Sequence, residues 1–127
     1  MSEYHETQFW KDSIELYRLS CEISEKLKQK KNFRFSEQLE SSCGSISDNI
    51  AEGFGRGGNR ELIQFLSIAR GSCAEFESQI VRCEIIGVIS NELKSEIIVK
   101  TTDIERQINA FINYLNTSEF KGTKFKK

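Results

Sequence analysis

The feature that most constrains the fold is a row of apolar and small residues spaced for one side of an α-helix. Its members recur at alternating steps of four and three residues: Leu62, Leu66, Ala69, Cys73, Phe76, Ile80 and Cys83. A helix with such a face needs other helices to cover it. The chain also has no proline, the residue that most readily breaks helices. The sequence therefore predicts a long amphipathic helix within a helical bundle.

Three further segments show helical spacing, and we predict helices over residues 8–30, 36–54, 59–87 and 90–116. In the first helix one apolar row is Trp10, Ile14, Tyr17 and Cys21, and a second row is Leu16, Ile23 and Leu27. The second helix has Leu39, Cys43, Ile46 and Ile50, and the fourth has Leu93, Ile97, Thr101, Ile104, Ile108, Phe111 and Leu115. Short links and the lack of a strand-like alternation predict an all-α, antiparallel up-down four-helix bundle.

Polar residues and glycines predict where these helices begin and end. We expect Ser36, Asn59 and Ser90 to be N-caps, because their side chains can accept hydrogen bonds from the first turn. Gly87 is the expected C-cap of the third helix. Residues 53–58, GFGRGG, are expected to reverse the chain between the second and third helices.

The length of 127 residues suits one domain. We predict an N-terminal extension over residues 1–7, the bundle over residues 8–116 and a flexible basic tail over residues 117–127. No apolar run is long enough to cross a membrane, and the N-terminus lacks a secretory pattern, so a cytoplasmic location is expected. The four cysteines lie on apolar faces without metal-ligand spacing and there is one histidine, so we expect neither a metal nor a cofactor.

Charge is unevenly distributed, although the formal net charge is −1. Residues 26–34 carry five positive charges and no negative charge, and the tail carries four lysines between Lys121 and Lys127. Clustered cations of this kind favour contact with phosphates. The candidate nucleic-acid-binding residues are Lys28, Lys30, Lys31, Arg34, Arg56 and Arg60, together with the lysine tail.

The glycine-rich segment at residues 53–58 raises the question of a phosphate loop. A P-loop requires a lysine followed by serine or threonine, and a preceding strand, and both are missing here. Nucleotide binding of that kind is therefore not expected. No histidine lies near a nucleophile, and the predicted protein is not an enzyme.

Several polar and aromatic residues leave alternatives open. Asn49, Glu52, Ser72 and Glu75 suit either a structural network between the second and third helices or a subunit or ligand contact. Gly71, in mid-helix, predicts a tight crossing within the bundle or between protomers. The aromatic residues outside the main rows are Phe9, Phe33, Phe35, Phe54, Phe65, Phe120 and Phe125. They either pack at the bundle ends or form an exposed protein-binding patch around Phe54 and Phe65.

A long segment resembles a known family. Residues 45–80, SISDNIAEGFGRGGNRELIQFLSIARGSCAEFESQI, resemble the hallmark region of the four-helix bundle proteins of the 23S rRNA intervening-sequence family. The opening FWKDSIELYRLSCEI resembles the first helix of that family. The positions that match the family pattern are Asn49, Glu52, Gly53, Arg56, Glu61, Phe65, Ala69, Gly71, Ser72 and Glu75.

This resemblance implies a bacterial protein whose relatives are often encoded within intervening sequences of large-subunit ribosomal RNA genes. A related branch, the accessory protein of diversity-generating retroelements, is a homopentamer that binds RNA and reverse transcriptase through a basic surface. The resemblance thus implies a non-enzymatic, homo-oligomeric scaffold or binding protein, a pentamer, with structured RNA as its ligand. The alternative is a protein-binding adaptor that uses the aromatic patch and has no nucleic-acid role.

Overall fold

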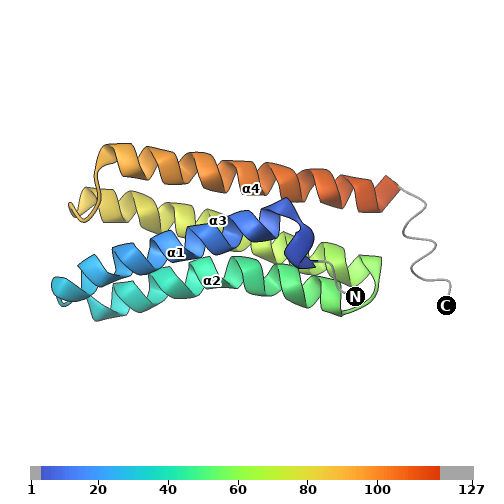
Figure 1. Ribbon diagram of the computed structural model, residues 1–127, viewed down its shortest axis with the longest axis horizontal. Coiled ribbons are helices and arrows are strands. Elements are labelled where there is room, and N and C mark those ends of the chain that lie inside the picture. Colours follow the sequence, from blue (N-terminus) through green and yellow to red (C-terminus); the bar gives the residue numbers. More distant parts are fainter. Residues whose placement is uncertain (1–3, 118–127) are drawn as a thin grey trace.

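The computed structural model describes residues 4–117, which form four long α-helices after one short 3-10 turn. The elements are η1 (Tyr4–Glu6), α1 (Gln8–Gln29), α2 (Phe33–Gly55), α3 (Asn59–Ile85) and α4 (Asn91–Thr117). Successive helices run in opposite directions (Figure 1), and no strand occurs among the described residues. The predicted all-α, up-down four-helix bundle is confirmed. Most of the predicted basic tail lies outside the described residues.

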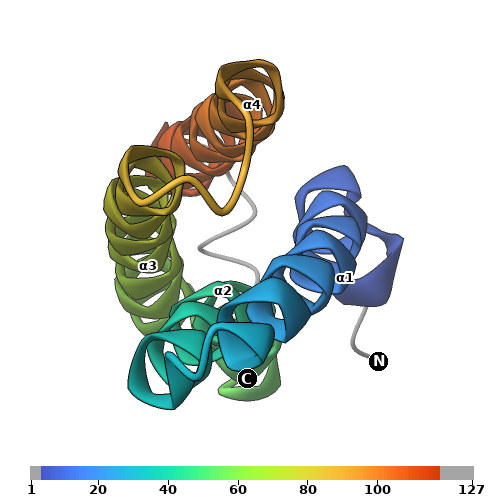
Figure 2. The same ribbon diagram turned by 90° about the vertical axis from the view of Figure 1, so that its left-hand side faces the viewer.

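The helices follow one another around the bundle in chain order (Figure 2). Contacts are most extensive between α2 and α3, and those between α1 and α4 are the sparsest of the four neighbouring pairs. The α1–α2 link and the α3–α4 link lie at one end of the bundle, which we call the α1/α2 end (Figure 1). The α2–α3 link lies at the other end, which we call the α2/α3 end.

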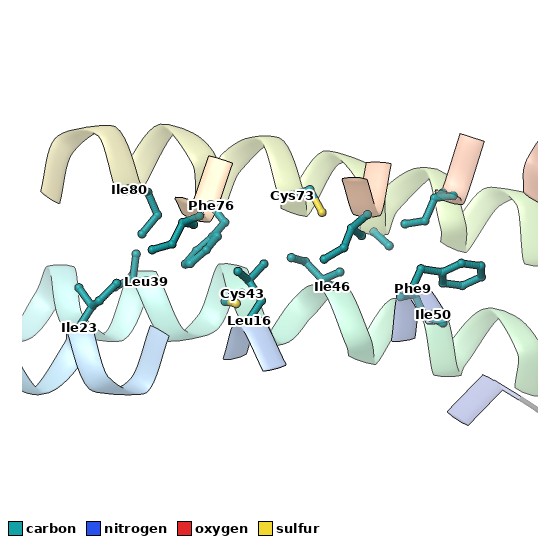
Figure 3. Close-up of a cluster of buried hydrophobic side chains, with 14 of the residues drawn as sticks. Phe9, Leu16, Ile23, Leu39, Cys43, Ile46, Ile50, Cys73, Phe76 and Ile80 are labelled. Carbon is teal, nitrogen blue, oxygen red and sulfur yellow. The ribbon is translucent and has the colours of Figure 1, made fainter. Parts of the chain in front are cut away.

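Apolar side chains from all four helices meet in one core (Figure 3). The whole predicted row of α3 is buried, as is the predicted row of α2. The predicted row of α4 is buried except at Leu93 and Phe111, which are half-buried against the core. Three helices therefore bury the faces that their apolar spacing predicts.

The first helix buries the second of its two predicted apolar rows, Leu16, Ile23 and Leu27, and leaves the first row at the edge of the core. Trp10, Tyr17 and Cys21 are only half-buried, and Ile14 is 41% exposed. The buried apolar residues are Phe9, Leu16, Ile23 and Leu27, accompanied by the buried serines Ser13, Ser20 and Ser24. The Ser13 and Ser20 hydroxyls each donate to a carbonyl three residues back, at 2.7 Å. Serines whose hydroxyls are hydrogen-bonded within their own helix thus form part of the inward face of α1. A prediction based on apolar residues alone does not include them.

Two of the three predicted N-caps are wrong. Ser36 is buried inside the first turn of α2, which begins at Phe33 after the cap residue Asn32. The side chain of Asn59 is buried in the first residue of α3, and Gly58 is the cap. Ser90 is confirmed, because its Oγ accepts a hydrogen bond from the Leu93 amide at 3.0 Å.

The link between α2 and α3 is shorter than the glycine-rich sequence suggests. Gly53 and Gly55 belong to α2, so residues 56–58 alone reverse the chain. Gly57 has a φ of +90°, a conformation that glycine adopts easily. At the other end of α3, Gly87 has a φ of +79° and follows the last helical residue, Ile85, by two positions.

Polar side chains also join each pair of neighbouring helices. The contacts are Ser24 with Ser36 between α1 and α2, Ser42 with Gln79 at 2.5 Å between α2 and α3, Glu77 with Thr101 between α3 and α4, and Gln107 with Asp12 at 2.9 Å between α4 and α1. Each hydrogen bond contributes only about 1 kcal/mol net. Their directionality nevertheless fixes how each helix is placed against the next.

Candidate nucleic-acid interface

The six candidate basic residues do not converge on one face of the protein. Lys28, Lys30, Lys31 and Arg34 lie at the α1/α2 end, whereas Arg56 and Arg60 lie at the α2/α3 end. The two groups are separated along α2, whose 23 residues span about 35 Å at a rise of about 1.5 Å per residue. The two basic groups are therefore separate surfaces.

A tight helix-to-helix link exposes the first of these groups. Lys31 has a φ of +64°, and its amide donates to the Lys28 carbonyl at 2.8 Å. The Asn32 amide reaches back to the Leu27 carbonyl at 2.9 Å. These two hydrogen bonds terminate α1 in a C-cap motif in which Lys31 adopts the αL conformation. The side chains of Lys30 and Lys31 consequently stand exposed at the end of the bundle.

The lysines and arginine of this end differ in how far they are neutralised. Lys28 Nζ lies 3.6 Å from a Glu25 carboxylate oxygen and 4.0 Å from one of Glu40. Lys30, Lys31 and Arg34 form no ion pair with any residue in the described range 4–117. The positive charge available to a ligand therefore comes mainly from the last three.

Exposed apolar side chains accompany these cations. Phe33, beside Arg34 in the chain, is 57% exposed. Ile85 and Ile86, at the end of α3, are 74% and 47% exposed. Phe33 is one of the aromatic residues outside the predicted rows, whereas the sequence pattern indicates no site role for Ile85 and Ile86. Because Ile85 and Ile86 lie off the buried rows and next to a helix end, their sequence positions indicate surface residues. Those positions do not indicate that the two residues are neighbours of the lysines.

Arg82 connects the end of α3 with the start of α2. Its guanidinium lies over the Phe35 ring, 4.5 Å from the ring centroid, and the ring itself is buried. Beside this contact is an open pocket of about 490 Å³, lined by Asn32, Arg34, Phe35, Gln38, Arg82, Ile85 and Ile86. No carboxylate lines it. The pocket therefore combines two cations, two amide groups and apolar surface.

At the opposite end, Arg56 and the aromatic candidates contact other residues of the protein, whereas Arg60 is exposed and forms no ion pair with any residue between Tyr4 and Thr117. Arg56 Nε donates to Glu52 at 2.9 Å, and its guanidinium lies 5.0 Å from the centre of the Phe65 ring. Phe54 stacks on Phe111 with 5.8 Å between ring centroids. Phe54 and Phe65 are both half-buried, so they do not form the exposed patch that the adaptor hypothesis needs. Phe120 and Phe125 lie outside the described residues.

Of the four polar family positions Asn49, Glu52, Ser72 and Glu75, only Asn49 and Ser72 take part in a contact between α2 and α3. Asn49 donates to the carbonyl and the hydroxyl of Ser45, each at 2.8 Å, and the Ser72 hydroxyl donates to Ser45 Oγ at 2.9 Å. Ser45 thus links Asn49 on α2 with Ser72 on α3. Glu52 and Glu75 are exposed, so neither holds the two helices together from inside. For these two glutamates the alternative of a structural network between the helices is wrong, and a subunit or ligand contact stays a prediction.

The close helix approach occurs at Gly53 rather than Gly71. A Cβ placed on Gly53 would lie 2.9 Å from Phe65 Cβ and 3.0 Å from Leu62 Cδ1. Gly71 is exposed, and a Cβ there would meet nothing within 4 Å. The predicted tight crossing at Gly71 within the bundle is therefore wrong. A contact at Gly71 between protomers stays a prediction.

Three of the four cysteines, Cys43, Cys73 and Cys83, are buried in the core. Burial raises the pKa of the Cys43 thiol to about 12 and that of the Cys83 thiol to about 11. Burial also raises the pKa of Cys73, with Glu105 and Glu77 adding to the effect. Among residues 4–117, no cluster of histidine, cysteine and carboxylate side chains could hold a metal ion. Within the same range, no helix has the apolar length needed for a membrane span.

The fold and this surface define a class of protein: an all-α four-helix bundle with a basic end that carries exposed apolar side chains. A family model described as "23S rRNA-intervening sequence protein" matches residues 5–110. The chain belongs to this family, as its resemblance predicts.

A solved structure shares the fold. It is a protein with unknown function from the S23 ribosomal protein family of Bacteroides thetaiotaomicron. The two are 24% identical with a TM-score of 0.76, over 82% of this chain and 97% of that chain. At this identity the likeness establishes the four-helix architecture and nothing about activity. The comparison with curated proteins found no match.

Proposed function

We propose that this protein is a non-enzymatic RNA-binding protein and that it binds RNA through the α1/α2 end. The observation that carries the proposal is the exposed Phe33 ring beside the unpaired cations Lys30, Lys31 and Arg34. Lysine and arginine gain affinity by displacing counterions from phosphates. An exposed aromatic ring offers a face on which a base can stack. The combination suits RNA better than it suits an acidic protein, which has no bases to stack.

Two further observations support the proposal. The family description names the 23S rRNA intervening sequence, which connects these proteins with ribosomal RNA genes. The raised pKa values of Cys43 and Cys83 keep both thiols protonated at neutral pH, which disfavours their use as nucleophiles. A binding role therefore agrees better with the side chains than a catalytic role does.

The proposal includes assembly into a homo-oligomer, and the family resemblance leads us to expect five copies. It also includes a cytoplasmic location. Several copies of the α1/α2 end in one particle would bind one RNA at several points. Linked sites of this kind gain affinity through their high effective concentration. A modest basic patch on each protomer is then sufficient.

A filter-binding assay at low salt tests the proposal. We expect Lys30→Gln/Lys31→Gln/Arg34→Gln to lower RNA affinity by about tenfold or more and to reduce the dependence of log K on log salt by about two units, since each single-strand phosphate contact contributes about 0.7. Arg56→Gln/Arg60→Gln, at the opposite end, is the control and should bind as the wild type does. Failure of the wild-type protein to retain any RNA at low salt would refute the proposal.

The adaptor alternative makes a different prediction. An adaptor would capture one partner protein in a pull-down after ribonuclease treatment. The proposal expects no such RNA-independent partner. Capture of one protein after ribonuclease treatment, undiminished in Lys30→Gln/Lys31→Gln/Arg34→Gln, would favour the adaptor.

A further inference from the structure

The pocket between the start of α2 and the end of α3 has a composition that phosphate binding alone does not require. We infer that it binds an unpaired nucleotide of the RNA, so that the α1/α2 end prefers single-stranded segments to duplex. The pocket has a volume of about 490 Å³ and is open to solvent, so an unpaired base can enter it from outside. The inference rests on the proposed RNA-binding function and specifies the form of RNA that is bound.

The polar lining can read the edge of a base. Asn32 and Gln38 each carry an amide, which offers both donors and acceptors to a Watson–Crick edge. The Asn32 side chain makes no capping hydrogen bond with α2, so its amide is available. Both residues are exposed and can therefore be reached from solvent.

The rest of the lining offers surfaces against which a planar base can pack. The Arg82 guanidinium is held over the Phe35 ring at 4.5 Å, and a fixed guanidinium plane stacks well on bases. Ile85 and Ile86 contribute apolar surface beside it. Phe33, next to Arg34 in the chain, provides an exposed ring at the same end of the bundle. Successive unpaired bases would thus find more than one surface for stacking.

The charge of the pocket selects an anionic ligand. Arg34 and Arg82 both line it, and no carboxylate does. Glu84, the acidic residue nearest to Ile85 in the chain, accepts a hydrogen bond from Asn91 at 3.0 Å and lies 3.8 Å from Lys94. Its charge is thereby partly neutralised. A base with its phosphate satisfies both the amides and the arginines.

Unpaired RNA fits this arrangement better than duplex does. In a helix of RNA the faces of each base are covered by stacking and its Watson–Crick edge is paired. A base must leave the stack before the amides and the arginine plane can contact it. Duplex RNA can still meet Lys30 and Lys31 through its phosphates, but without gaining the contacts of the pocket.

Fluorescence anisotropy with a labelled single-stranded RNA and a blunt duplex of the same sequence tests this inference. We expect the wild-type protein to bind the single strand about tenfold tighter than the duplex. Phe33→Ala should weaken single-strand binding about fivefold or more, the lower range for loss of one stacking contact. Gln38→Leu should weaken it by about fivefold, as expected for loss of one hydrogen bond. Both variants should leave duplex binding unchanged. Phe33→Tyr should retain the preference.

Matched variants serve as controls. Gln64→Leu changes an exposed glutamine on α3, and Val99→Ala truncates an exposed apolar residue on α4, so both should bind as the wild type does. Equal affinity for the two RNAs, or wild-type single-strand binding by both Gln38→Leu and Phe33→Ala, would overturn the inference while leaving the proposed function intact. No binding of either RNA would overturn both. Because Phe33 and Gln38 are exposed, circular dichroism should show native helix content in each variant.

Discussion

At Gly53 the packing of α2 on α3 leaves no room for a side chain. The methyl group that Gly53→Ala introduces would lie 2.9 Å from Phe65 Cβ, closer than carbon atoms pack. We expect this substitution to lower the free energy of unfolding by about 1–3 kcal/mol, as overpacking does. A urea denaturation curve measures the change.

Gly71→Ala is the matched control on the neighbouring helix. Its Cβ would meet nothing within 4 Å, and alanine favours a helix over glycine by about 1 kcal/mol. We therefore expect this variant to be slightly more stable than the wild type. A loss of stability in Gly71→Ala, or no loss in Gly53→Ala, would contradict the packing described for these two glycines.

Glu105 is a carboxyl at the α3–α4 interface whose burial, with the nearby Glu77, raises its pKa against the opposing effect of Arg70. A group with a higher pKa in the folded protein than in the unfolded chain binds its proton more tightly when folded. This contribution to stability is complete below the unfolded pKa and is lost as pH rises through the folded pKa. Glu105 therefore destabilises the protein at neutral pH.

Glu105→Gln should accordingly be more stable than the wild type at pH 7, with a difference that shrinks as pH falls toward about 4, the ordinary pKa of glutamate. Thermal unfolding followed across this pH range measures it. Glu96→Gln, an exposed change on the same helix, is the control. A difference that does not depend on pH would count against the assigned cause.

Among the helices, α3 was the most predictable, because its apolar row from Leu62 to Cys83 is unbroken and all of it is buried. On α1 only the second predicted row, from Leu16 to Leu27, is buried, because Ser13, Ser20 and Ser24 complete the inward face in place of the first row. A prediction from the spacing of apolar residues cannot show that a serine hydroxyl donates a hydrogen bond to a carbonyl of its own helix and can therefore be buried. The same limitation misplaced Ser36, which faces Ser24 instead of capping α2.

The buried pair Ser24 and Ser36 gives a prediction about the α1–α2 contact. Ser24→Ala or Ser36→Ala should each lower the free energy of unfolding by about 1–2 kcal/mol, because the remaining hydroxyl loses its partner in the core. The double variant should cost less than the sum of the two, and a double-mutant cycle by urea denaturation measures this coupling. Ser41→Ala, exposed on α2, should be nearly neutral. Strict additivity would contradict the pairing.

Of the candidate site, only the basic run that ends at Arg34 was predictable from the sequence. The run from Lys26 to Arg34 is evident as a charge cluster, and the structure keeps it at one end of the bundle. Arg82, Ile85 and Ile86 could not be assigned to the same surface, because they approach it only when α3 returns antiparallel to α2. Arg56 and Arg60 were grouped with the lysines by charge alone, and the length of α2 separates them.

For the whole molecule, the family resemblance predicts a homopentamer. Light scattering coupled to size exclusion should give a mass of five times the 14.6 kDa chain. A particle with the mass of one chain would refute the predicted assembly. A monomer would not by itself contradict RNA binding at the α1/α2 end, which the binding assays test.

The central claim is that RNA binds at the α1/α2 end. Hydrogen–deuterium exchange, with and without saturating single-stranded RNA, locates the contact in an assembly of any size. Bound RNA should slow exchange in residues 30–38 and 82–88 and leave residues 56–61, at the opposite end, unchanged. Protection confined to residues 56–61, or no change anywhere at saturation, would contradict the claim.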